Sequence, residues 1–219
     1  MGTTTVDMSK SGLFSKVSLL LSLSFIISAF GTYAGAGITS MGAIIGLAIL
    51  FILGAFAVPF AAKASTTAGI TALTIWTFIS GLFIGPTINH YAHVLGWETV
   101  FLAYLGTGGV MAACGAIGIF SGFNFSSLGR WLMFALLGLI VVSIFGIFVP
   151  FSQGVNIVYS VIGMLVFAGF FVFDFFRAKD APNTWESAIM VTMNSYLNFI
   201  NFLLYLLRFL EAIFGSKKS

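Results

Sequence analysis

A carboxylate interrupts an apolar run late in the chain. Asp174 lies within the segment Phe171-Val-Phe-Asp-Phe-Phe176, whose other members are all apolar. A carboxylate in such surroundings is costly unless it is paired, hydrated or protonated, so Asp174 is a candidate cation ligand or proton sensor. The alternative is a carboxylate at the headgroup boundary that pairs with Arg177.

Asn198 is the residue that we expect to face Asp174. Both lie twelve positions from Glu186, one before it and the other after it. If two helices run antiparallel and turn near Glu186, these two side chains reach the same depth. The alternative is that Asn198 only holds helices together, as asparagines in membrane helices commonly do.

The last apolar stretch, Ser187 to Phe214, carries its polar residues at helical spacing. From Asn194 onward the steps are +4, +3, +4 and +3, which is the spacing of one helical face. The polar stripe comprises Ser187, Asn194, Asn198, Asn201, Tyr205 and Arg208. Because amides and a guanidinium are costly in lipid, the stripe is expected to face protein or water. We therefore predict that this helix is central and that the stripe lines a pathway or bridges helices.

Each of three charged residues near predicted helix ends has two possible roles. Arg208 and Glu211, three apart, are expected either to pair or to anchor the helix end by snorkelling. Lys63 is by default a positive-inside anchor, and it is also the nearest basic candidate for a partner of Asp174.

The remaining candidates for chemistry are weak. His90 and His93 are three apart, but no third metal ligand stands at a suitable spacing. Cys114 is the single cysteine, so an intrachain disulfide is excluded. The sequence offers no serine, histidine and acid arrangement, no Gly-rich phosphate loop and no basic stripe for nucleic acid. We expect neither an enzyme nor a nucleic-acid-binding protein.

The composition places the chain in the lipid bilayer. Of 219 residues, 59% are hydrophobic and 7% are charged, whereas a soluble domain carries about 25% charged residues. Seven apolar runs have about the 20 residues needed to cross hydrocarbon. They are Val17–Gly37, Met41–Ala62, Thr66–Ile88, Glu98–Phe120, Leu128–Pro150, Asn156–Phe176 and Ser187–Phe214.

All seven runs are predicted to be helices, because an open strand edge cannot be left in lipid. The expected fold class is an all-α membrane protein, a seven-transmembrane-helix bundle with the C-terminal helix central. Residues 17–214 form the transmembrane domain, and residues 1–16 and 215–219 are short tails. Gly42 and Gly46 predict close approach of a neighbour to the second helix.

Basic residues predict the orientation. With the N-terminus inside, the inner side holds Lys10, Lys16, Lys63, Arg130, Arg177 and Lys179. The outer side holds Lys217 and Lys218 alone, and the predicted loops at 38–40, 89–97 and 151–155 contain no Lys or Arg. We expect a prokaryotic cytoplasmic membrane, with the N-terminus inside and the C-terminus outside. A re-entrant seventh segment would bring the tail lysines inside, and the first run also resembles a signal peptide.

Three stretches together resemble the transmembrane Bax inhibitor motif family, the Bax inhibitor-1-like proteins. The first is Ser80-Gly-Leu-Phe-Ile-Gly-Pro86 followed by Asn89-His-Tyr-Ala92, and the second is Tyr159-Ser-Val-Ile-Gly163 running on to Asp174. The third is Ser195-Tyr-Leu-Asn-Phe-Ile-Asn-Phe202 with Leu206-Leu-Arg-Phe209. The resemblance covers roughly residues 60–214, and the three stretches occur in the same order.

The resemblance implies a seven-helix bundle around the last helix and a pH-sensitive calcium leak. In the bacterial calcium-leak members, two aspartates on the sixth and seventh helices share a proton and gate the pore. Asp174 matches the first aspartate, whereas Asn198 stands at the second, and Lys63 stands where the second helix commonly has Arg. Without the second carboxylate, we expect blunted pH gating and a weaker calcium site.

Two functions follow as expectations. The first is a leak channel or transporter for calcium or another cation, with Asp174 as ion ligand or sensor, Asn198 as its partner and Lys63 as a closing counter-charge. Calcium is then the bound or transported ion, and no other cofactor is expected. The alternative is a membrane-embedded regulator of other membrane proteins, through membrane protease modulation or cell-death suppression.

Overall fold

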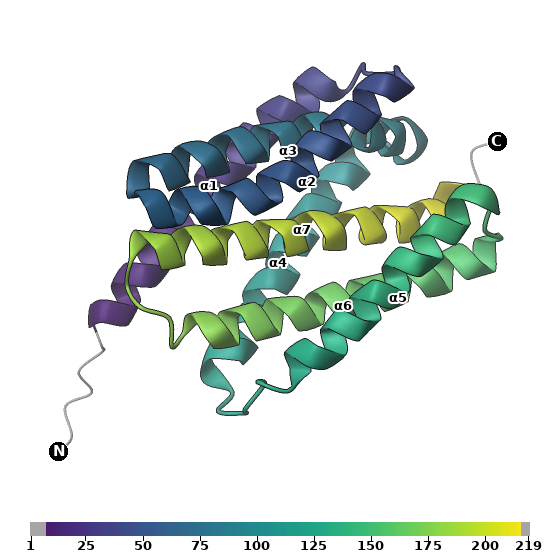
Figure 1. Cartoon of the computed structure of the whole chain (residues 1–219). Coiled ribbons are helices and arrows are strands. Elements are labelled where there is room, and N and C mark those ends of the chain that lie inside the picture. Colours follow the sequence, from purple (N-terminus) through teal and green to yellow (C-terminus); the bar gives the residue numbers. More distant parts are fainter. Residues whose placement is uncertain (1–7, 216–219) are drawn as a thin grey trace. The chain divides into compact units, whose positions relative to one another are not determined.

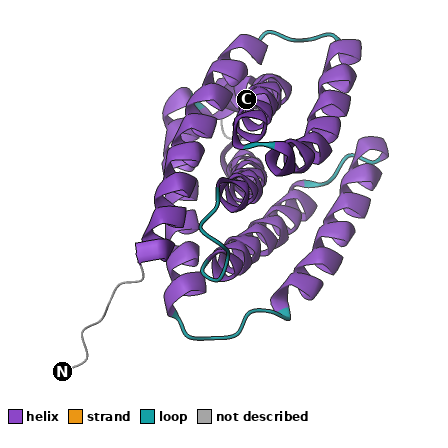
Figure 2. Cartoon of the chain, turned by 60° about the vertical axis from the view of Figure 1, so that its left-hand side comes forward, coloured by secondary structure: helices purple, strands orange, loops and turns teal. Residues whose placement is uncertain are grey.

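The described part of the chain is built of α-helices. The computed structural model describes residues 8–215, apart from the side chains at 8–11 and 147. The helices are α1 (Met8–Gly35), α2 (Met41–Ala64), α3 (Thr66–Leu95), α4 (Trp97–Phe120), α5 (Leu128–Phe148), α6 (Gln153–Ala178) and α7 (Trp185–Phe214). All seven are long and apolar enough to cross a membrane, and residues 8–215 contain no strand (Figure 2). The predicted all-α membrane class is confirmed.

Several helices run past the predicted spans. α1 begins at Met8, inside the predicted tail 1–16, and α3 continues to Leu95. His90 and His93 therefore lie on a helix and not in the predicted loop 89–97. α3 is followed by Gly96, whose φ of 92° is a left-handed conformation that favours glycine. Lys217 and Lys218, which entered the orientation prediction, lie outside the described residues.

The helices form two compact units. Within the described residues, unit 1 comprises 8–90 and 180–196, and unit 2 comprises 91–179 and 197–215. α7 contributes its first part to unit 1 and its remainder to unit 2. The central position of the C-terminal helix stays a prediction.

In unit 1, α1 and α3 pack with their backbones close together. A Cβ at Gly81 would collide with the Ser28 carbonyl oxygen, and one at Gly31 would collide with the Phe78 carbonyl oxygen. Small residues at such a crossing permit the dispersion contacts that hold helices together in lipid, where no hydrophobic force does so. The predicted close approach at Gly46 is wrong, because a Cβ there meets nothing within 4 Å in the described chain.

Gly81→Leu is expected to destabilise the protein by at least about 1–3 kcal/mol, because the two backbones must separate to admit the side chain. Gly46→Leu adds the same side chain in open space and is the matched control. The measurement is thermal unfolding of both variants in detergent. Equal midpoints for the two variants would contradict the α1–α3 packing.

Unit 2 is organised on α6. α6 packs against both α4 and α5 (Figure 1). Glycines on α4 permit close contact with α6: a Cβ at Gly118 would collide with the Val172 carbonyl oxygen. The second part of α7 also contacts α6, through Tyr205, whose ring lies against Gly163. These contacts bring α6 and α7 together along the residues singled out by the sequence.

Candidate functional site

The central feature of unit 2 is a hydrogen bond between α6 and α7. The Asn198 side-chain amide donates to the Asp174 carboxylate, with 2.6 Å between Nδ2 and Oδ2. Asn198 is 8% exposed, and Asp174 is half-buried. The predicted juxtaposition is confirmed: two antiparallel helices that turn near Glu186 bring the carboxylate and the amide to one depth.

The surroundings of Asp174 are aromatic. Its neighbour Phe175 lies against Gly115 of α4, where a Cβ would come within 3.1 Å of the ring. The Arg177 guanidinium lies over the Phe173 ring, 5.6 Å from its centroid, a geometry typical of a cation–π contact. The carboxylate is thus held by an amide from α7, and the residues on both sides of it in the chain are phenylalanines.

The other amides of the polar stripe differ in their contacts. Asn201 donates from Nδ2 to the Leu197 carbonyl oxygen of its own helix, at 2.8 Å. Asn194 belongs to the part of α7 in unit 1 and is half-buried. Their predicted role as pathway-lining or helix-bridging groups stays a prediction.

Tyr205 belongs to a cluster of hydroxyl groups from three helices. The Tyr159 hydroxyl of α6 donates to the Leu139 carbonyl oxygen of α5 at 3.1 Å. It also bonds the hydroxyls of Ser143 at 2.5 Å and Tyr205 at 2.9 Å. One phenol therefore connects α5, α6 and α7. Sequence reasoning missed the roles of Tyr159 and Ser143. The position of Tyr159 in the quoted stretch Tyr159–Gly163 was the available signal, whereas Ser143 reads as an isolated polar residue in an apolar helix.

Tyr159→Phe is expected to destabilise the protein by about 1–3 kcal/mol, because its hydroxyl partners lose their bonds inside the packed helices. The matched control is Tyr33→Phe, which removes the same hydroxyl from a residue that is 87% exposed. Unfolding in mixed detergent micelles measures both variants. A Tyr159→Phe midpoint as high as that of the control would contradict the cluster's stabilising role.

Arg208 lies beside this cluster. Its guanidinium is over the Tyr159 ring, 5.3 Å from the centroid, and it hydrogen-bonds the Tyr91 hydroxyl. It also lines a cavity with Ser143, Gly146, Phe151 and Asn156. Its predicted pairing with Glu211 stays a prediction.

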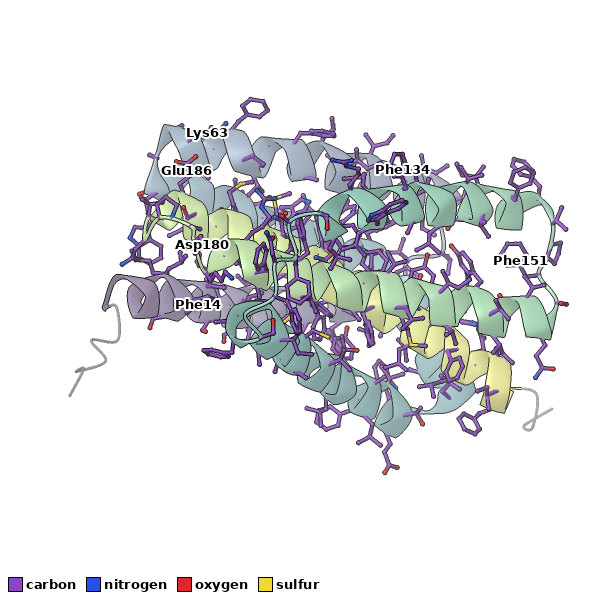
Figure 3. All side chains as sticks on the ribbon, turned by 90° about the horizontal axis from the view of Figure 1, so that it is seen from below. Phe14, Lys63, Phe134, Phe151, Asp180 and Glu186 are labelled. Atoms are coloured by element: carbon purple, nitrogen blue, oxygen red, sulfur yellow. The ribbon has the colours of Figure 1, made fainter. Side chains whose placement is uncertain are left out.

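Lys63 belongs to unit 1. It lies in the last turn of α2, at the same end of unit 1 as Asp180 and Glu186 (Figure 3). Lys16 also lies near this end, where its ammonium donates to the Asn183 side-chain oxygen at 2.9 Å. The predicted role of Lys63 as a counter-charge to Asp174 stays a prediction.

Unit 1 contains a second buried polar group that the sequence did not single out. The Tyr196 hydroxyl lies 2.7 Å from the Ser28 hydroxyl and 2.9 Å from that of Ser80. These bonds join α7 to α1 and α3. The positions of Ser80 and Tyr196 in the quoted motifs were the available signal.

Among residues 8–215, no group of three or more His, Cys, Asp and Glu side chains gathers where it could hold a metal ion. A calcium ligand set at Asp174 would therefore combine one carboxylate with amide and carbonyl oxygens. Such a set is weaker than one with several carboxylates.

Comparison with known proteins identifies the family. Residues 10–216 match the family described as "Inhibitor of apoptosis-promoting Bax1". The chain is 30% identical over 141 residues to "Bax inhibitor 1" of Schizosaccharomyces pombe. The aligned residues make up 64% of this chain and 51% of the yeast protein.

Bacterial relatives are similar over more of their length. An uncharacterized membrane protein of Streptococcus pyogenes is 31% identical over 176 residues, 78% of this chain and 73% of the relative. An uncharacterized membrane protein of Vibrio cholerae is 31% identical over 198 residues, which are 87% of this chain and 85% of the relative. The chain therefore belongs to the Bax inhibitor family of integral membrane proteins.

Proposed function

We propose that this protein is a leak pathway for a cation, with calcium the first ion to test. Asp174 is its ion ligand and Asn198 positions that carboxylate. The observation that carries the proposal is the 2.6 Å bond between the α7 amide and the α6 carboxylate. A carboxylate within a membrane-spanning helix is by default a functional group.

The chemistry of the pair suits a weak cation site. The Asn198 N–H holds one carboxylate oxygen, and an amide also has an oxygen that can accept. Carboxylate and amide oxygens are the ligands that calcium takes in proteins. Conduction requires an ion to bind well enough to enter and weakly enough to leave, which a site with one carboxylate permits. We expect transport without enzymatic turnover, and no cofactor besides the ion.

The test is calcium entry into dye-loaded liposomes that contain the purified full-length chain. Entry above that of protein-free liposomes, increasing with the amount of folded protein, is the expected result. The same proposal includes the orientation of the chain, with the N-terminus on the inner side of the membrane. It also includes Lys63 as the positive charge that balances Asp174 when the pathway is closed. Absence of entry with folded protein would overturn the leak pathway.

The alternative is a regulator that binds other membrane proteins. The name of the yeast relative, Bax inhibitor 1, favours it, and the Asn198–Asp174 bond would then serve only to hold α6 to α7. Under this alternative, Asp174→Asn preserves function, because an Asn at this position can still accept the Asn198 N–H.

A further inference from the structure

The cavity beside Arg208 lies far along α6 from Asp174, and the proposed ion pathway does not use it. Its volume is about 180 Å³, and it is lined by Ser143, Gly146, Phe151, Asn156 and Arg208. All of these residues belong to unit 2. Phe151 marks the end of α5 and α6 that is distant from Phe134 (Figure 3).

The lining is cationic and polar. The Arg208 guanidinium presents several N–H donors in a fixed plane, a geometry that matches the oxygens of a phosphate. The cavity also lies at the start of α6, between Phe151 and Asn156, where the helix N-terminus carries partial positive charge. Both features favour an anion and disfavour a cation.

The cavity walls are held by hydrogen bonds. Ser143 bonds the Tyr159 hydroxyl, and Asn156 donates to the Phe151 carbonyl oxygen at 3.2 Å. Gln153 at the start of α6 donates to the Ala212 carbonyl oxygen of α7 at 2.6 Å. The three elements around the cavity are therefore tied together, and Arg208 is oriented by the Tyr159 ring.

The location suits a lipid headgroup. Arg208 lies six residues before α7 ends at Phe214, about 9 Å along the helix axis, so its side chain reaches the membrane–water boundary. Exposed apolar side chains flank the cavity at this end. Phe145 and Phe148 on α5 are 64% and 78% exposed, and Val155 and Val158 on α6 are 47% and 59% exposed. Acyl chains can lie along these side chains.

We propose that this cavity binds a phosphate group, with the headgroup of an anionic phospholipid as its source. Glu211 lies one turn beyond Arg208 on α7, and its negative charge is expected to weaken the binding of an anion at this end of the helix. The proposal does not depend on the leak pathway, since its readout is binding.

The experiment uses purified full-length protein in detergent and two soluble lipids. Dioctanoyl phosphatidic acid and dioctanoyl glycerol have the same acyl chains, and only the first carries a phosphate. We expect the wild type to bind phosphatidic acid, and Arg208→Gln to weaken this binding by roughly tenfold or more. Arg130→Gln removes the same charge from an exposed position of unit 2 and is the matched control.

Two further variants keep the proposal testable if Arg208→Gln does not fold. Ser143→Leu retains the Arg208 charge and fills the cavity, so it is expected to abolish binding. Because it also removes the bond to the Tyr159 hydroxyl, its fold is checked by thermal unfolding. Glu211→Gln is expected to tighten binding severalfold, because it removes a negative charge one turn from Arg208. Equal binding of dioctanoyl glycerol, or undiminished binding by both cavity variants, would overturn the proposal.

Competition with inorganic phosphate shows whether the bound phosphate group belongs to a lipid headgroup or to free phosphate. If phosphate alone does not displace phosphatidic acid, the lipid headgroup is the ligand, as proposed. Displacement at phosphate concentrations comparable to those of the lipid would support the phosphate site but overturn the lipid as its source.

Discussion

Asp174→Asn is expected to lower calcium entry into liposomes by roughly ten- to a hundredfold. An interaction with a charged group is worth about 1.5–3 kcal/mol, and each 1.4 kcal/mol is a tenfold change in an equilibrium constant. The substitution removes the charge and preserves the shape. The amide oxygen of an Asn at this position can still accept the Asn198 N–H, so the α6–α7 contact survives.

The control for this prediction is Asp180→Asn, because Asp180 is an exposed residue after α6. It undergoes the same chemical change outside the α6–α7 contact, and flux is expected to stay at the wild-type level. Thermal unfolding of both variants separates loss of flux from loss of fold. Wild-type flux in folded Asp174→Asn protein would remove the carboxylate from the pathway and favour the regulator.

The second large effect concerns pH. Asn198→Asp is expected to make calcium entry increase steeply between about pH 6 and about pH 8, whereas the wild type changes far less. The substitution places two carboxylates at the positions of Asp174 and Asn198, whose side chains are in hydrogen-bond contact. Two carboxylates that share a site cannot both ionise easily, so the pair retains a proton at the acid end of the range. Release of that proton adds a second negative charge to the site, which attracts calcium more strongly.

The wild type and Asn198→Asp differ at one position, so the difference between their pH profiles isolates the effect of the added carboxylate. Asn124→Asp, at an exposed loop position of unit 2, is the matched control. A wild-type profile as steep as that of Asn198→Asp would contradict blunted gating by the Asp174–Asn198 pair.

The sequence alone determined the class of the protein and the order of its helices. Apolar runs of membrane-spanning length leave few alternatives, because unpaired backbone groups cannot remain in lipid. The sequence did not determine where the helices end, since hydropathy reports which residues leave water and not where the backbone hydrogen bonds stop. α1 and α3 accordingly extend past the apolar runs Val17–Gly37 and Thr66–Ile88.

The pairing of Asp174 with Asn198 could be predicted because it depends on a local property, the position of the turn between two antiparallel helices. The Tyr159 cluster and the Arg208 cavity could not. They depend on which faces of α5, α6 and α7 meet, and that is decided by packing details such as the Tyr205 ring against Gly163. Sequence spacing places a residue on a helix face, but only the tertiary structure decides which other face it contacts.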